Sequence, residues 1–170
     1  LGDVYKRQQE KYAYGNKKYQ IVVPKGVADI LAEGKILCHC VARNQNDVYW
    51  DRISRHETYL LFLRKADAPH VPYYTLEVEP DGTIRQKRTK FDRQEEDIEQ
   101  ATQFLKHWQK VIAKRLTTED RQLAATSRVL REEEFKELRE KDVRIYVGDF
   151  QGQRLVDVLT ADLLETDRAA

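Results

Sequence analysis

The spacing of apolar residues changes once along this chain, near Asp92. Before that point, short runs rich in β-branched and aromatic residues alternate with polar turns, which is typical of strands, at 19–23, 58–64 and 73–79. After it, apolar residues recur every three or four positions, which is typical of amphipathic helices, over about 94–116 and 118–141. The order predicts an α+β fold, a small antiparallel β-sheet with a central hairpin followed by long charged C-terminal helices.

Shorter elements are predicted around these. Residues 26–33 form a short helix that Gly34 should end, and 36–41 are either a strand or the buried end of that helix. Residues 49–55 are ambiguous. Alternation over 143–147 favours a last strand, and the apolar spacing over 155–163 favours a closing helix.

The segment Pro80-Asp81-Gly82 predicts the turn of the hairpin, because Pro and Asp favour a type I turn and Gly accepts the left-handed position after it. Counting outward from this turn pairs Val78 with Ile84, Glu77 with Arg85 and Leu76 with Gln86. Gln86 would then lie on the apolar face, and Glu77 and Arg85 would form a cross-strand ion pair on the other face.

The length and composition are typical of one domain that is rich in charged residues of both signs. The 170 residues include 30 Lys and Arg against 29 Asp and Glu, so nucleic-acid binding would need a local basic patch. No apolar run approaches the roughly 18 residues of a membrane span, so no membrane contact is expected. Cys38 and Cys40 are too close in sequence to brace a fold, which favours a reducing compartment and a cytoplasmic location.

The start of the chain is unusual. Residues 1–8 contain no initiator Met and look like a translated artefact at the end of a metagenomic assembly, so they are left out of the fold prediction. The predicted organisation is then 1–8 artefact, 9–116 α+β domain and 117–170 helical extension, in a fragment of a longer protein. The apolar residues Leu130, Phe135 and Leu138 predict that the extension contacts another chain or a preceding part of the same protein.

Several polar residues lie within the predicted strands, where each buried polar group needs a partner or costs about 1–3 kcal/mol. They predict a ligand-binding site on the sheet, made of His39, Arg64, Thr75, Glu77 and Gln86. His39, Glu77 and Gln86 are the catalytic candidates. The alternative is purely structural. His39 would then be a core residue whose hydrogen bonds are all made, and Glu77 would belong to an ion pair that supports the fold. Cys38-His39-Cys40 lacks the spacing of a zinc half-site, so neither metal nor cofactor is predicted.

One dense basic cluster follows the hairpin. Arg85, Lys87, Arg88, Lys90 and Arg93, with Phe91 among them, are suited to contact phosphate groups. A solvated hairpin end is the alternative.

The order of motifs resembles the PcfJ-like protein family. The similarity rests on His39-Cys40-Val41, Leu61-Phe62-Leu63-Arg64, Tyr73-Tyr74-Thr75-Leu76-Glu77 and Ile84-Arg85-Gln86, within about 19–115. The family occurs on conjugative plasmids, in phages and in bacterial genomes, so the resemblance implies a mobile-element setting and a cytoplasmic location, without a defined activity. Two hypotheses stay open: a module that binds DNA or a transfer or replication protein, and an enzyme whose His39, Glu77 and Gln86 act on a nucleotide-like ligand.

Overall fold

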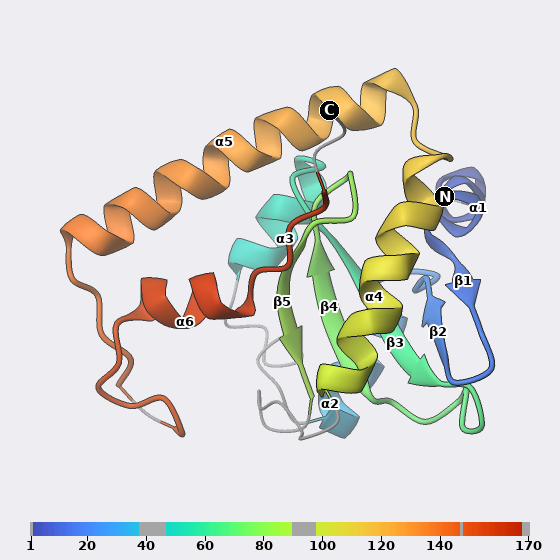
Figure 1. Ribbon diagram of the computed structural model, residues 1–170, viewed down its shortest axis with the longest axis horizontal. Coiled ribbons are helices and arrows are strands. Elements are labelled where there is room, and N and C mark those ends of the chain that lie inside the picture. Colours follow the sequence, from blue (N-terminus) through green and yellow to red (C-terminus); the bar gives the residue numbers. More distant parts are fainter. Residues whose placement is uncertain (1, 38–46, 90–97, 147, 168–170) are drawn as a thin grey trace.

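The computed structural model describes residues 2–37, 47–89, 98–146 and 148–167 (Figure 1). Within these ranges the fold is α+β, as predicted: one antiparallel sheet carries five strands in chain order. The strands are β1 (Tyr14–Gly15), β2 (Tyr19–Val22), β3 (Tyr59–Lys65), β4 (Tyr74–Val78) and β5 (Ile84–Arg88). The helices are α1 (Gly2–Tyr12), α2 (Val27–Leu37), α3 (Asp47–Ser54), α4 (Ile98–Ala113), α5 (Thr118–Glu140) and α6 (Leu155–Asp162).

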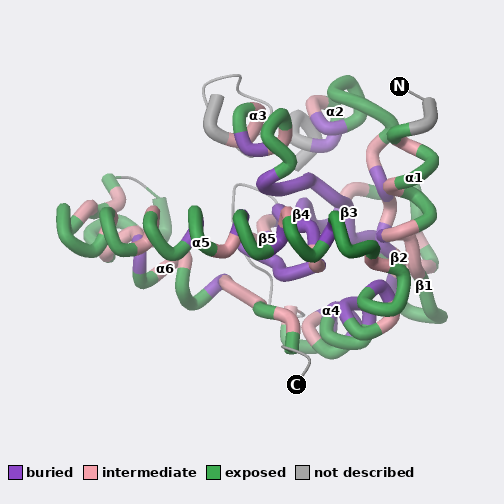
Figure 2. The backbone as a smooth tube through the Cα atoms, turned by 90° about the horizontal axis from the view of Figure 1, so that it is seen from above, coloured by how far each residue is buried: buried purple, intermediate pink, exposed green. Residues whose placement is uncertain are grey.

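The sheet lies between two helical layers. Seen from above, α4 covers one face, α2 and α3 cover the other, and α5 crosses the end of the strands that carries the β4–β5 hairpin (Figure 2). The segment after α6 runs along the outer edge of β5, where Leu164 exchanges backbone hydrogen bonds of 2.9 and 2.8 Å with Ile84. This segment pairs the edge strand, which would otherwise present unpaired backbone groups.

The main apolar core lies between α4 and the sheet. Leu105, Trp108 and Ile112 recur on one side of α4 and are fully buried against apolar side chains of β3, β4 and β5. The Trp108 indole nitrogen donates to the Tyr12 carbonyl oxygen at 2.7 Å, so α1 is tied to the same core. A smaller apolar cluster around Leu60 and Phe62 fills the opposite face below α2 and α3.

The hairpin differs from the predicted register by one residue. Val78 faces Ile84 as predicted, but Glu77 faces Gln86 rather than Arg85, because Arg85 is the extra residue of a β-bulge. The predicted pairing of Glu77 with Arg85, and the position of Gln86 on the apolar face, were therefore wrong. The bulge lets Arg85 and Gln86 reach the neighbouring carboxylates of Glu79 and Glu77 instead.

Other boundaries also differ from the prediction. Helix α2 continues through Gly34 to Leu37, so this glycine does not end it, and 38–41 lie outside the described residues. The ambiguous segment is helix α3. In place of a last strand, the structure has a single bridge between Arg144 and Arg154 among the described residues of that segment. Helix α1 includes most of the residues set aside as an artefact; their origin stays a prediction.

Helix α5 begins with a capping box. Thr117 accepts a hydrogen bond from the Asp120 backbone nitrogen, and the Asp120 carboxylate accepts one from the Thr117 nitrogen. Asp120 also accepts a hydrogen bond of 2.7 Å from the Lys11 ammonium group of α1. Burial opposes the charged form of Asp120, but these hydrogen bonds lower its pKa below the usual value. The charged carboxylate therefore stabilises the start of α5.

Gly82 is expected to be essential to the hairpin. Its φ is +95°, and an added Cβ would lie 2.6 Å from the Ile112 Cδ1 atom of α4. We expect Gly82→Ala to lower the free energy of unfolding by about 2–4 kcal/mol, from left-handed backbone strain and overpacking together. Gly152→Ala is the matched control, because Gly152 has φ +87° but a Cβ added there would meet no neighbouring atom within 4 Å, so only the strain of about 1–2 kcal/mol applies. Urea denaturation measures both; equal losses would contradict the close packing of Ile112.

Candidate functional site

A cluster of charged residues lies under α5, at the hairpin end of the sheet. We call it the polar cluster. Its side chains are buried, except that the Glu134 side chain is 37% exposed. It consists of three arginines and four glutamates: Arg52, Arg85, Arg131, Glu57, Glu77, Glu79 and Glu134.

Arg52 of α3 joins the sheet to α5. Its Nη1 donates to both carboxylate oxygens of Glu77 on β4, at 3.2 and 3.1 Å. Its Nη2 donates to both oxygens of Glu134 on α5, at 2.8 and 2.9 Å. Burial opposes the charge of Arg52, but the surrounding carboxylates of Glu77, Glu134 and Glu57 raise its pKa above the usual value. Arg52 therefore stays charged.

Glu79 is the other centre of the polar cluster. Its Oε2 accepts hydrogen bonds from Nε of Arg85 at 2.8 Å and from Nε of Arg131 at 2.7 Å. Arg85 also donates to Glu57 at 2.9 Å and to the carbonyl oxygen of Ser127 on α5 at 3.0 Å. The bulged residue of β5 is thus the point where the sheet and α5 meet.

Helix α5 faces the rest of the protein with a polar stripe. Its buried residues are Asp120, Ala124, Ser127 and Arg131, at steps of three and four, and Glu134 continues the series. Leu130 lies away from this stripe and is 38% exposed. A search for apolar periodicity overlooks such a stripe, although its spacing is present in the sequence. The predicted contact of Leu130, Phe135 and Leu138 with another chain stays a prediction.

Two of the three catalytic candidates lie together. The side-chain nitrogen of Gln86 is 3.4 Å from Oε1 of Glu77, and Gln86 accepts a hydrogen bond from the Tyr49 hydroxyl at 3.3 Å. Glu77 also accepts one from Thr58 at 2.8 Å, so its carboxylate receives donors from Arg52, Thr58 and Gln86. Thr75 is two residues earlier on β4 and buried on the same face. His39 lies outside the described residues.

Arg64 belongs to a different contact. It is four residues along β3 from Leu60, which faces Glu77, so the two sites are separated by roughly 13 Å of strand. Both terminal nitrogens of Arg64 donate to the Glu33 carboxylate of α2, and its guanidinium lies 5.0 Å from the Phe62 ring centroid. Burial raises the pKa of Glu33, an effect that Arg64 partly offsets. This pair holds α2 on the sheet.

The described members of the predicted basic cluster do not form an exposed patch. Arg85 is buried in the polar cluster. Lys87 donates to the Asp162 carbonyl oxygen at 2.6 Å, and Arg88 donates to the Asp162 carboxylate at 2.5 Å. These two cations hold α6 against β5. Lys90 and Arg93 lie outside the described residues.

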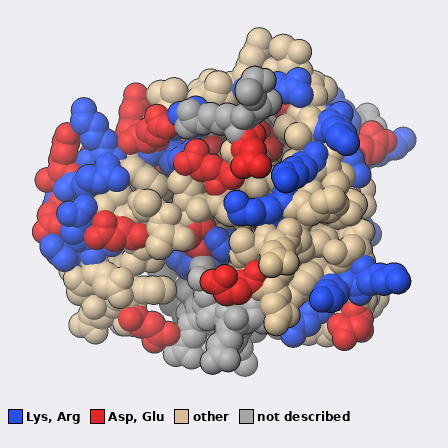
Figure 3. All heavy atoms as spheres, viewed as in Figure 1, with Lys and Arg blue, Asp and Glu red and all other residues tan. Residues whose placement is uncertain are grey.

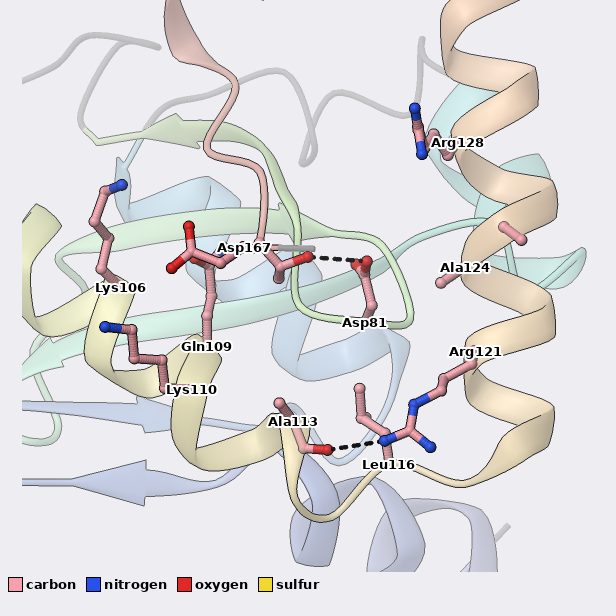
Figure 4. Close-up of a pocket in the computed structure, with 12 residues that line it drawn as sticks. Asp81, Lys106, Gln109, Lys110, Ala113, Leu116, Arg121, Ala124, Arg128 and Asp167 are labelled. Atoms are coloured by element: carbon pink, nitrogen blue, oxygen red, sulfur yellow. Dashed lines mark hydrogen bonds between the residues drawn. The ribbon is translucent and has the colours of Figure 1, made fainter. Parts of the chain in front are cut away.

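A cavity of about 580 Å³ lies elsewhere, between α4 and α5. We call it the basic groove. Lys106 and Lys110 extend from α4, Arg121 and Arg128 from α5, and Asp81 of the hairpin turn lies between them (Figure 4). Lys and Arg side chains lie over α4 on the face shown in Figure 3, with Asp and Glu side chains beside them. Sequence reasoning did not identify this groove, because its residues come from distant segments.

The part of the chain that the structure describes contains neither a metal-binding cluster nor a membrane-spanning helix. No group of three or more His, Cys, Asp or Glu side chains there is arranged to hold a metal ion. No described helix has the length and apolar character needed to cross a membrane. Cys38, His39 and Cys40 lie outside the described residues.

The family of the chain follows from a direct comparison. A family model for PcfJ-like proteins matches residues 3–102, more than half of the 170 residues. The chain belongs to the PcfJ-like protein family. No curated protein and no solved structure matches it. The match to the PcfJ-like family includes α2, α3, all five strands, α1 except Gly2 and the first turn of α4, whereas α5 and α6 follow the matched region. The predicted boundaries at residues 9 and 117 stay predictions.

Glu79 should be the residue on which the polar cluster most depends. We expect Glu79→Ala to lower the free energy of unfolding of the PcfJ-like chain by about 3–5 kcal/mol, because Arg85 and Arg131 would stay buried without their shared carboxylate. Glu132→Ala is the control: its carboxylate pairs with Arg128 on the surface of α5, and we expect a loss below about 1 kcal/mol. Chemical denaturation followed by circular dichroism measures the difference; losses of similar size would contradict a structural role for the cluster.

Proposed function

We propose that this PcfJ-like protein is a cytoplasmic binding module of a plasmid or phage system, and that it binds DNA through the basic groove. The observation that supports this proposal is the set of cations that line the groove. Lys106 and Lys110 are exposed, and neither forms an ion pair within the described residues. A protein partner of a transfer or replication system is the alternative occupant.

Four cations and two carboxylates, Asp81 and Asp167, line the groove, so positive charge is in excess there. Asp81 is engaged locally, since its carboxylate accepts hydrogen bonds from the Thr83 nitrogen at 2.9 Å and the Thr166 hydroxyl at 3.1 Å. Arg128 pairs with Glu132, and Arg121 donates to the Ala113 carbonyl oxygen. Lys106 and Lys110 are one helical turn apart, so their ammonium groups are neighbours that can contact successive phosphates.

The salt dependence of DNA binding tests this proposal. We expect Lys106→Ala with Lys110→Ala to weaken binding of a short labelled oligonucleotide and to reduce the slope of log affinity against log salt by about 1–2, one or less for each lost phosphate contact. Fluorescence anisotropy at several salt concentrations measures the slope. Lys17→Ala with Lys18→Ala makes the same change in charge on the exposed β1–β2 turn and should leave the slope unchanged.

A third variant distinguishes DNA binding in the basic groove from DNA binding by the basic residues at 85–93. Lys87→Ala with Arg88→Ala removes two cations that hold Asp162, so the expected effect is a loosened α6 with little change in the salt slope. A slope reduced by this variant, and not by the α4 variant, would move the interface to 85–93. Absence of DNA binding by the wild-type chain would refute the proposal.

A ligand site on the sheet is a second candidate function, because two of its candidate residues, Glu77 and Gln86, lie 3.4 Å apart. His39, Glu77 and Gln86 would then bind a nucleotide-like ligand. Glu77 already accepts hydrogen bonds from three side chains, which suits an anchoring role better than proton transfer.

Titration with NAD⁺, followed by NMR, tests this second candidate. A nucleotide site at the sheet predicts that NAD⁺ shifts the Gln86 side-chain amide resonances and that Gln86→Ala removes the binding. Gln103→Ala on the exposed side of α4 is the control and should bind as the wild type does. Unchanged spectra of the wild-type chain would rule the nucleotide site out.

A further inference from the structure

Glu134 differs from the other members of the polar cluster in its exposure. Its side chain is 37% exposed, whereas those of Arg52 and Glu77 are 10% and 1% exposed. Within the described residues Glu134 hydrogen-bonds to the cluster through Arg52, and it does so with both carboxylate oxygens. It has the most exposed side chain of the four glutamates in the cluster.

Arg52 has two edges with different partners. Nη1 faces the buried Glu77 on the sheet, while Nη2 faces outward to Glu134 at 2.8 and 2.9 Å. An arginine whose terminal nitrogens face an opening is the preferred protein group for carboxylates and phosphates. Glu134 therefore stands where the oxygens of an external anion would bind.

A small cavity adjoins this contact. It has a volume of about 10 Å³, room for about one water molecule, and is lined by Arg52, Arg85, Gln86, Glu134, Phe135 and Leu159. Rotation of Glu134 outward would add the space of one carboxylate. The enlarged site would accept a compact oxyanion and would be too small for a nucleoside. Phe135 and Leu159 give one part of the cavity an apolar lining, and an ionic contact is stronger beside apolar groups than in water.

We propose that Arg52 and Gln86 form a binding site for a compact oxyanion, such as a phosphate group, and that Glu134 occupies this site as an internal competitor. The polar cluster holds four glutamates and three arginines, so an entering anion replaces the Glu134 charge rather than adding to it. This oxyanion site and the basic groove have different lining residues, so neither site requires the other.

Helix α5 can stay in place when Glu134 leaves. Arg131 remains bound to Glu79, and the Ser127 hydroxyl donates to the Glu57 carbonyl oxygen at 2.7 Å. Both contacts lie N-terminal to Glu134, within two turns of the helix. A rotation of one side chain is then sufficient to open the site.

The test compares two neutralised glutamates on the same helix. Glu134→Gln removes the charged competitor, and Glu133→Gln is the matched control, because Glu133 is an exposed residue of the same helix and is not a member of the polar cluster. Inorganic phosphate is titrated into each variant and into the wild type by calorimetry at constant ionic strength. We expect Glu134→Gln to bind phosphate at least about tenfold more tightly than the wild type and Glu133→Gln.

NMR of the same samples locates the bound anion. Phosphate should shift the Arg52 side-chain resonances and the Leu159 methyl groups of Glu134→Gln. Acetate, the carboxylate counterpart, should produce the same shifts with lower affinity, because it carries less charge. Equal phosphate affinity in the two variants would overturn the proposal. So would shifts at Lys106 and Lys110 in place of Arg52, since these would assign the anion to the basic groove.

Discussion

The shared carboxylate of Glu79 is the contact on which the arrangement around the hairpin depends. It binds Arg85 from the bulge of β5 and Arg131 from α5, so one buried anion holds a strand and a helix that are far apart in sequence. Buried ion pairs of this kind are often no more stabilising than apolar residues of the same size. Loss of one partner is costly, however, so the contact specifies a unique position for α5.

The helices α4 and α5 therefore differ in what holds them against the sheet. Helix α4 packs through Leu105, Trp108 and Ile112, and such burial tolerates small shifts because it has no direction. Helix α5 is positioned by hydrogen bonds whose geometry allows one register, with Ser127 and Arg131 one helical turn apart. The Lys11–Asp120 contact adds a third fixed point at its start. Rigidity at the hairpin end of the sheet thus comes from direction-dependent contacts.

The sequence was most informative where apolar periodicity and turn chemistry decide the structure. It predicted β3, β4, the Gly82 turn and α4, and it identified Glu77 and Gln86 as polar residues that need partners. It missed the bulge at Arg85, because counting from a turn assumes an unbroken ladder. It also missed the inner side of α5, since the buried residues there are polar. Arg52, Glu57 and Arg131 carry no local signal, because their partners are distant in sequence.

Charge pairing also explains why the densest run of basic residues is not the best candidate for an anion site. Arg85 forms ion pairs with Glu57 and Glu79, and Lys87 and Arg88 both form ion pairs with Asp162. The fold brings these carboxylates to the cations from other segments. In a chain with a net charge of +1, the cations that remain accessible matter more than the cations that are close in sequence. Both proposed anion sites use α5, through Arg121 in its first turn and Arg128 near its middle, and through Glu134 in its second half. One helix therefore borders both sites, and its hydrogen bonds through Ser127 and Arg131 fix the part of α5 that lies between them.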